Sequence, residues 1–196
     1  MDGQLLAWGL RRRAPIPRLW LFTDDRRLPD PRPSVAALPR GRAGVVLRHD
    51  GDPDRASLAR DLARLCRERR LLLVIAGDVR LAARHGAGVH LRGGRWPGPV
   101  RPRGLVTSSA HAAADLRKAK QAGAAMAFLS PAFPTESHRG SPGLGAVRWS
   151  ALTRQAPPGL AVAALGGIDG RSVRRLPVRS LRAVGAIGAL SAGEAD

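Results

Sequence analysis

The sequence contains a single cysteine, Cys66, no tyrosine, and only three Phe and four Trp residues. A lone cysteine excludes an intramolecular disulfide and any zinc or iron–sulfur site that is built from several cysteines. The scarcity of aromatic side chains leaves few surfaces on which the bases of a single-stranded nucleic acid could stack. Cys66 lies on the apolar stripe of an expected helix, so we interpret it as a packing residue and not as a nucleophile.

Long apolar runs are also absent. No stretch approaches the ~20 apolar residues that a membrane-spanning helix needs. At the N-terminus, the apolar residues of LLAWGL precede the basic run RRR, which is the reverse of the order in a secretory signal. We therefore expect a cytoplasmic protein that has no membrane partner.

Acidic residues are few. The chain has 15 Asp and Glu residues against 33 Lys and Arg residues, which gives a formal net charge of +18. Lys118 and Lys120 are the only lysines, so arginine carries almost all of the positive charge. Such an excess is the first property expected of a nucleic-acid-binding protein. The arginines are scattered, however, with short clusters only at 11–13 and 67–70. We expect no nucleic-acid partner, and binding through net charge alone is the alternative; some of the arginines could instead hold phosphate groups.

What the chain does contain is a series of eight short apolar runs without polar alternation. Such runs are typical of strands that are buried on both faces, as in parallel sheets. They occupy residues 19–23, 43–47, 71–76, 88–91, 104–108, 124–129, 160–165 and 182–187.

Helical patterns fill several of the gaps between these runs. The clearest pattern spans residues 53–69, with Asp52 as N-cap and a proline in the first turn. A second, over residues 110–122, would be capped by Ser108 or Ser109 and would end at a glycine. Shorter helical patterns occupy residues 78–85, 147–155 and 170–176.

Alternation of strands and helices in this order predicts an α/β fold, a short (β/α)8 TIM barrel in which some helices are truncated. Residues 92–104 (RGGRWPGPVRPRG) hold too much Pro and Gly for a normal helix. An open doubly wound sheet is the structural alternative, but the number of strands and the lack of an early GxGxxG motif favour closure. We expect an N-terminal extension over residues 1–18 and a single barrel domain over residues 19–192.

In a parallel barrel the active site lies at the carboxyl ends of the strands. The residues that follow the apolar runs are therefore the site candidates, and many of them are small or polar. Glycines after the seventh and eighth runs are typical of a phosphate site made of backbone N–H groups. His90 lies inside a run, so we interpret it as a hydrogen-bonded core histidine. The candidates are Thr23, Asp24, Asp25, Arg48, His49, Asp50, Gly77, Asp78, His90, Ser108, Ser109, His111, residues 130–138, Gly166, Gly167 and Gly188.

Six segments occur in the order found in a known family: LFTDD, GVVLR, LAARHGAGVHL, TSSAH, FLSPAFPTESH and ALGGI. In these segments the chain resembles thiamine phosphate synthases and the related thiazole tautomerases, from about Leu19 to Ala192. The fold of that family is a (β/α)8 barrel, which agrees with the fold expected from the strand count.

The resemblance implies a transferase of thiamine biosynthesis. This enzyme couples hydroxymethylpyrimidine diphosphate to a thiazole phosphate and releases pyrophosphate, with Mg²⁺ as cofactor. By the resemblance, Arg48 would hold the diphosphate, and Ser109 would donate a hydrogen bond to the diphosphate or the pyrimidine. His138 stands where the family has a lysine, so we take Arg48, Ser109 and His138 as catalytic candidates.

The resemblance also implies a second phosphate site, for the thiazole substrate. Thr135 and the backbone N–H groups of the glycine turns at Gly166, Gly167 and Gly188 would form it. Small phosphorylated molecules are thus the expected partners. A homo-oligomer is also possible, because the sequence does not determine the oligomeric state.

The resemblance is incomplete at the metal site. Where the synthases carry Asn-Asp, whose aspartate holds magnesium, this chain has Ala76 and Gly77, and the second magnesium aspartate is replaced by a Gly-rich stretch. Asp78 and Asp50 are the substitute ligands that we expect if a metal binds, and Asp24 or Asp25 could join them. Arginines could also neutralise pyrophosphate without metal. A diverged non-catalytic binder of phosphate ligands is one alternative, and a thiazole tautomerase is another, although Pro131 replaces the histidine of the tautomerases.

Overall fold

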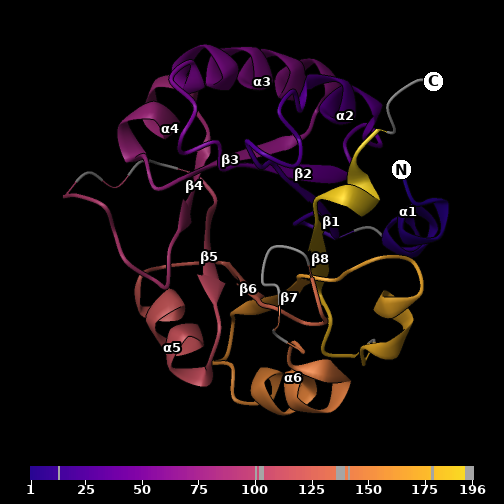
Figure 1. Cartoon of the computed structure of the whole chain (residues 1–196). Coiled ribbons are helices and arrows are strands. Elements are labelled where there is room, and N and C mark those ends of the chain that lie inside the picture. The colour runs from indigo at the N-terminus through magenta and orange to yellow at the C-terminus, as the bar shows by residue number, and fades with distance from the viewer. Residues whose placement is uncertain are drawn as a thin grey trace.

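The computed structural model describes residues 1–12, 14–99, 101, 104–135, 140, 142–177 and 179–192. Its strands form a closed barrel in chain order, in which each strand pairs in parallel with the next and β8 pairs with β1 (Figure 1). The (β/α)8 prediction is therefore confirmed, and the open sheet is excluded. The strands are β1 (Leu19–Phe22), β2 (Ala43–Leu47), β3 (Leu72–Ala76), β4 (Gly88–Leu91), β5 (Val106–Ala110), β6 (Met126–Leu129), β7 (Ala161–Leu165) and β8 (Ala183–Ala186).

The helices lie outside the ring of strands (Figure 1). Several are short, as expected, and among the described residues the connection between β4 and β5 contains no helix. No helix of the described segments is long and apolar enough to cross a membrane. The helices are α1 (Gly3–Leu10), α2 (Arg32–Ala37), α3 (Arg55–Arg69), α4 (Val79–His85), α5 (Ala113–Gln121) and α6 (Gly145–Thr153), with 3-10 turns η2 (Ser172–Arg175) and η3 (Gly188–Leu190).

Residues 1–18, which we expected as an extension, include α1. The Asp2 carboxylate caps this helix by accepting hydrogen bonds from the N–H groups of Gln4 and Leu5. Leu5 and Trp8 are buried and belong to the same hydrophobic core as the strands. The helix therefore packs against the barrel, close to β1 and β8 (Figure 1).

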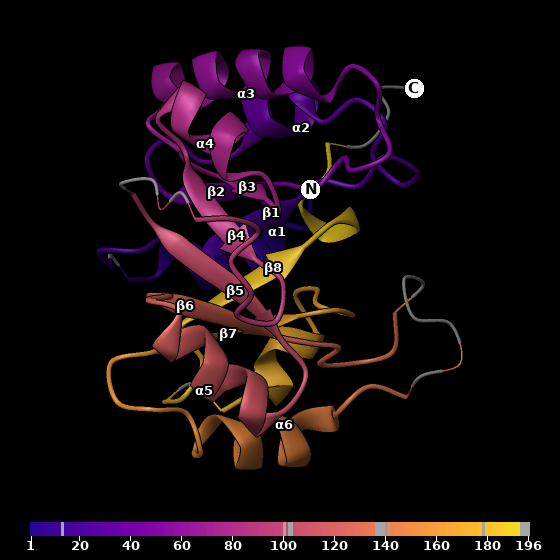
Figure 2. The same cartoon turned by 90° about the vertical axis from the view of Figure 1, so that its left-hand side faces the viewer.

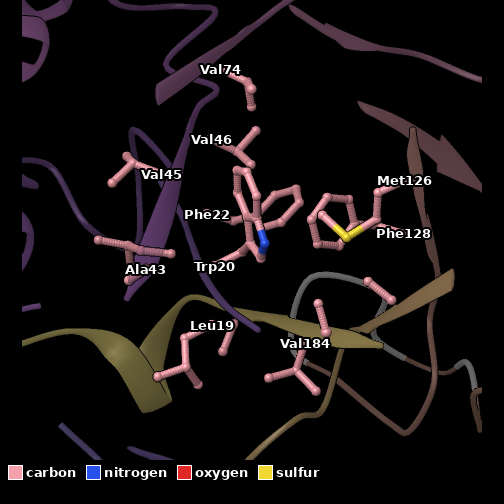
Figure 3. Packing of buried hydrophobic residues seen from close by; sticks show 14 of the residues in the cluster. Leu19, Trp20, Phe22, Ala43, Val45, Val46, Val74, Met126, Phe128 and Val184 are labelled. Carbon is pink, nitrogen blue, oxygen red and sulfur yellow. The ribbon is translucent and has the colours of Figure 1, made fainter. Parts of the chain in front are cut away.

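The interior of the barrel is filled by aromatic side chains, with Trp20, Phe22 and Phe128 at its centre (Figure 3). The rings of Phe22 and Phe128 meet edge to face, with centroids 4.7 Å apart. Two glycines make room for these rings. A Cβ atom on Gly44 would lie 2.4 Å from the Trp20 ring, and one on Gly185 would lie 2.6 Å from Phe22. Large residues on β1 thus pack against small residues on its two neighbours, β2 and β8.

The fifth strand begins two residues later than predicted, because it runs from Val106 to Ala110. Both serines of the TSSAH segment therefore lie inside the strand, and the prediction that one of them caps α5 is wrong. Asp115 caps this helix instead, since its carboxylate accepts hydrogen bonds from the N–H groups of His111 (2.9 Å) and Ala112 (3.1 Å).

The third helix also begins two residues later than predicted, at Arg55. Asp52 was the expected N-cap, but its carboxylate accepts from the N–H of Asp54 (2.8 Å) and its carbonyl from the N–H of Arg55 (3.1 Å). These bonds close a turn that precedes the helix. The C-terminal limit is as predicted, because Arg70 adopts the left-handed conformation and ends the helix.

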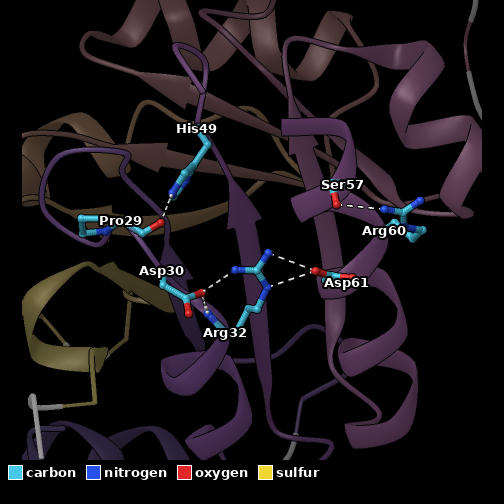
Figure 4. Close-up of polar contacts among 7 residues, drawn as sticks. All are labelled: Pro29, Asp30, Arg32, His49, Ser57, Arg60 and Asp61. Atoms are coloured by element: carbon cyan, nitrogen blue, oxygen red, sulfur yellow. Dashed lines mark hydrogen bonds and ion pairs between the residues drawn. The ribbon is translucent and has the colours of Figure 1, made fainter. Parts of the chain in front are cut away.

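Polar contacts on the outside of the barrel join α2 to α3 (Figure 4). The Arg32 guanidinium lies between two carboxylates, at 3.0 Å from an oxygen of Asp30 and 3.0 Å from an oxygen of Asp61. Because these side chains are largely exposed, water and salt screen the pairs, and we expect them to contribute little to stability.

Candidate functional site

A cavity of about 690 Å³ lies at the carboxyl ends of the strands. Phe22 and His90, which belong to the barrel interior, form part of its floor. Figure 2 shows the barrel from the side, with the segments that flank residues 136–139 extending from this end. His138 lies outside the described residues, and Asp78 does not line the cavity. The other residues to which the resemblance assigns a role line it: Arg48, Asp50, Ser109, Thr135, Gly166, Gly167 and Gly188. Several further candidates do not line it: Thr23, Asp24, Asp25, His49, Gly77 and Ser108.

Arg48 directly follows β2, and a buried threonine fixes its backbone. The Arg48 N–H donates to Thr23 Oγ1 at 2.9 Å, while the guanidinium lies 3.3 Å from a carboxylate oxygen of Asp24. His49 Nδ1 lies 2.9 Å from the same Thr23 oxygen, and its Nε2 lies 3.2 Å from the Pro29 carbonyl (Figure 4). Because a carbonyl only accepts, His49 Nε2 carries a proton, and the Thr23 hydroxyl can donate to a neutral Nδ1. Thr23 therefore organises the start of the loop that carries Arg48.

Asp50 lies between two guanidinium groups that the sequence analysis did not single out. One oxygen of Asp50 lies 3.3 Å from Arg55 Nη2, and the other is in close contact with Arg92 Nη2. Arg55 also donates to the carbonyl of Ala76 at the end of β3. The signal for Arg92 was present in the sequence, because this residue comes directly after the fourth apolar run. It was missed because arginine is scattered throughout the chain.

Two serines of β5 hold the loop that follows β4. Ser109 Oγ accepts a hydrogen bond from the N–H of Gly93 at 3.0 Å, and Ser108 Oγ accepts from the N–H of Gly94 at 2.9 Å. The hydroxyl proton of Ser109 is not used in these bonds, so this side chain can still donate to a ligand in the cavity. Ser109 therefore also positions the loop that begins with Arg92.

The paired glycines after β7 form a turn that only glycine accommodates. Gly166 and Gly167 have φ values of 89° and 63°, in the left-handed region. A Cβ atom on Gly167 would lie 2.4 Å from the Pro134 carbonyl oxygen. The Gly166 carbonyl in turn accepts a hydrogen bond from the N–H of Phe133. The turn thus packs directly against the loop after β6, which brings Thr135 to the same wall of the cavity.

His90 is buried beneath this site, as expected, and its Nδ1 lies 2.9 Å from Thr107 Oγ1. Burial lowers the pKa of His90 to about 3, and the nearby charges of Arg48 and Arg92 act in the same direction. The imidazole is therefore neutral near pH 7. The charges of Arg48 and Arg92 thus lie close enough to the imidazole to disfavour its protonated form.

His111 lines the cavity from the loop between β5 and α5, and not from the first turn of a helix as expected. Its Nδ1 lies 2.8 Å from the carbonyl oxygen of Ser130. Since this oxygen only accepts, Nδ1 carries the proton, and the bond ties the loop after β5 to that after β6.

The carboxylates do not fit the magnesium site that the resemblance implies. Asp78 accepts a hydrogen bond from the N–H of Leu81 at 2.9 Å and caps α4 outside the cavity. Asp50 is engaged by two arginines. Within the described ranges, no group of three His, Cys, Asp or Glu side chains could hold a metal ion. We therefore derive no step that depends on a metal.

Comparison with known proteins agrees with this architecture. The family described as thiamine monophosphate synthase matches residues 23–190 of the chain. Thiamine phosphate pyrophosphorylase from Pyrococcus furiosus superposes with a TM-score of 0.75 at 22% identity, over 90% of this chain and 89% of that chain. The enzyme of the same name from Bacteroides thetaiotaomicron gives a TM-score of 0.54 at 18% identity, over 89% of this chain and 84% of that chain. At these identities the two structures show the common fold, whereas the match over residues 23–190 shows that the chain belongs to the thiamine monophosphate synthase family.

Proposed function

We propose that the protein is a transferase that couples hydroxymethylpyrimidine diphosphate to thiazole phosphate and forms thiamine phosphate. The observation that carries this proposal is that two groups of residues with donors suited to anions line one cavity. Arg48 and Arg92 follow β2 and β4, whereas Thr135, Gly167 and Gly188 follow β6, β7 and β8. A cavity with two such ends suits a reaction between two phosphorylated substrates.

The first end would take the diphosphate. Arg48 and Arg92 can each present two parallel N–H donors to phosphate oxygens, which is the geometry in which arginine binds phosphate most strongly. Ser109 lies between the two ends in chain order and has a hydroxyl proton to donate. At the second end, the glycine turn at Gly167 and the Thr135 hydroxyl would hold the single phosphate of the thiazole.

In the proposed reaction, the bond between the pyrimidine methylene carbon and the diphosphate oxygen breaks, and pyrophosphate leaves with the electron pair. The thiazole nitrogen then donates its lone pair to the methylene carbon and forms the new C–N bond. Arg48 and Arg92 would stabilise the negative charge that develops on the leaving group. Phe22 and the neutral imidazole of His90 form a floor that adds no positive charge near the pyrimidine cation.

The direct test supplies the purified protein with both precursors and detects thiamine phosphate by mass spectrometry, with and without magnesium. Product that appears only with active protein supports the proposal. Absence of product under both conditions, with a protein that binds both precursors, would contradict it. Arg95→Ala provides a control for general loss of charge, because Arg95 lies near Arg92 but does not line the cavity.

A second candidate function is a non-catalytic binder of phosphorylated ligands. The observation that favours it is that the described part of the chain contains no group of three or more His, Cys, Asp or Glu side chains that could hold a metal ion. Calorimetry with each precursor separately distinguishes the two candidates, since a binder takes up a precursor without forming product. A thiazole tautomerase is less well supported, because Pro131, which lines the cavity where the tautomerases have a histidine, cannot transfer a proton.

A further inference from the structure

We propose that this site binds the diphosphate group without a metal ion, between the guanidinium groups of Arg48 and Arg92. In the free protein, Asp50 takes the place of the diphosphate on Arg92, and the ligand displaces it. The identity of the ligand as a diphosphate rests on the function proposed above, whereas metal-free binding follows from the arrangement of charges in this chain.

The first observation is that two nearby carboxylates, those of Asp50 and Asp24, are already engaged. Both oxygens of Asp50 contact guanidinium groups. One oxygen of Asp24 accepts from the N–H groups of Arg26 and Arg27, and the other contacts Arg48. A magnesium ion would have to compete with these cations for each carboxylate, and it dehydrates reluctantly.

The second observation concerns Gly77, which stands where the resemblance implies a magnesium-binding aspartate. A Cβ atom on Gly77 would lie 3.5 Å from Arg92 Nη2 and 3.6 Å from Arg92 Cζ. The guanidinium of Arg92 thus lies against the position from which an aspartate side chain would start. In this chain a fixed cation occupies the region where the family has a carboxylate and its metal ion.

The third observation is that the two arginines keep donors available for a ligand. The side chain of Arg92 is 60% exposed and that of Arg48 is 36% exposed, and both line the cavity. Each uses one terminal nitrogen in its ion pair, so other N–H groups of each fork remain. The lowered pKa of His90, caused in part by both arginines, is consistent with a positive potential between them.

A site in which carboxylates hold a metal ion and a site formed by two arginines predict opposite effects of replacing Asp50 on the affinity for diphosphate. If Asp50 is a competing anion, replacing it with Asn frees Arg92, and the mutant binds diphosphate more tightly. If Asp50 is a metal ligand, the same replacement weakens binding in magnesium. The sign of the change therefore separates the two arrangements.

The test measures binding of inorganic pyrophosphate to the full chain by isothermal titration calorimetry, in EDTA and in excess magnesium. We expect binding in EDTA that is at least as tight as in magnesium. Arg92→Ala should weaken it by about 10- to 100-fold, because a charge-assisted pair to phosphate is lost. Asp50→Asn should tighten it by about twofold to fivefold, the worth of an exposed ion pair.

Arg95→Ala is the matched control, since it removes the same charge from the same loop without touching the cavity, and its affinity should stay close to that of the wild type. Inorganic phosphate should bind more weakly than pyrophosphate, because it carries less negative charge and fewer oxygens that can accept hydrogen bonds from arginine. Equal weakening by Arg92→Ala and Arg95→Ala would show attraction by net charge only and overturn the proposal. Binding that requires magnesium, or no binding at all, would also overturn it.

The outcomes also separate this inference from the proposed function. Pyrophosphate bound in EDTA without formation of thiamine phosphate from the two precursors supports the metal-free site and rejects the transferase. Thiamine phosphate formed only with magnesium, by a protein that does not bind pyrophosphate in EDTA, supports the transferase and rejects the metal-free site.

Discussion

The Thr23 hydroxyl accepts a hydrogen bond from the backbone N–H of Arg48 at 2.9 Å, and this bond joins the ends of β1 and β2 at the mouth of the cavity. The same oxygen lies 2.9 Å from Nδ1 of His49. Thr23 is fully buried, so no water can replace either bond. The position of Arg48 therefore depends on a side chain that does not itself touch the cavity.

Thr23→Val keeps the shape of the side chain and removes both hydrogen bonds. We expect a loss of about 1–3 kcal/mol in the free energy of unfolding, because the Arg48 N–H and His49 Nδ1 lose their partner. Denaturant unfolding measures this change. Thr23→Ser retains the hydroxyl and serves as the control, so equal destabilisation by both variants would show that the lost methyl packing matters and not the hydrogen bonds.

Gly44→Ala should destabilise the barrel. The added Cβ would lie 2.4 Å from the fully buried ring of Trp20, which has no space to move aside. Overpacking of this kind typically costs about 1–3 kcal/mol. Gly98→Ala is the control, since a Cβ there meets nothing within 4 Å. A thermal melt in which both variants match the wild type would contradict the described packing of the barrel interior.

His90 should make stability depend on pH. Its pKa is about 3 in the folded protein and near 6.5 in the unfolded chain, so the unfolded state binds more protons between these values. Stability from this group is full above pH 6.5 and falls as the pH drops toward 3, by up to about 1.4 kcal/mol per pH unit. Urea unfolding at several pH values, compared with His90→Gln, isolates this effect. If the free energy of unfolding of His90→Gln depends on pH as steeply as that of the wild type, the effect does not come from His90.

Gly167→Ala and Gly188→Ala should differ in their effects. At Gly167 the backbone has a φ of 63° and a Cβ would lie 2.4 Å from the Pro134 carbonyl, so the turn must deform. At Gly188 a Cβ meets nothing within 4 Å. We expect Gly167→Ala to lower stability by about 1–3 kcal/mol and to weaken binding of thiazole phosphate. Gly188→Ala should keep the stability of the wild type, and calorimetry with thiazole phosphate compares the two.

Cys66 should be inert in the folded protein. It is 2% exposed, and burial raises the pKa of its thiol to about 12, so the reactive thiolate is scarce near neutral pH. A thiol reagent should therefore react only after denaturant unfolds the chain. Rapid modification under native conditions would show that α3 does not pack on the barrel as described.

The fold was predictable because its signal lies in local sequence. Each strand is a compact apolar run, and the runs at 43–47 and 88–91 match β2 and β4 exactly in their limits. The boundaries of β5 and α5 were not predictable from the run alone. Residues Leu105 and Val106 are both apolar, and only pairing with β4 and β6 determines where the strand begins.

Short helices were harder to recognise. The helix α2 has six residues and starts beside prolines, so it shows no repeated apolar spacing. The helix α1 has an apolar face, but its capping residue, Asp2, also accepts a hydrogen bond from Gly170, a contact between distant parts of the chain. A contact between residues so far apart in the sequence cannot be recognised from the local pattern of apolar and polar residues.

The site was predictable where a residue follows a strand directly, as Arg48 and Gly167 do. It was not predictable where side chains meet from different loops. The contact of Asp50 with Arg92 joins the segments that follow β2 and β4, and only the pairing of both strands with β3 brings these segments together. Asp78 illustrates the converse, because its carboxylate follows β3 and yet is turned to the N-terminus of α4.

The pairing of β8 with β1 has a consequence for when the candidate site forms during folding. Leu19 lies opposite Val184, so this last seam joins residues from nearly opposite ends of the polypeptide, and contacts so distant in sequence form slowly. Until β8 pairs with β1, the strands that precede Arg48 and Gly188 have no fixed separation. If the protein binds a phosphorylated ligand as proposed, binding during refolding would therefore report that the barrel has closed, and not merely that the chain has collapsed.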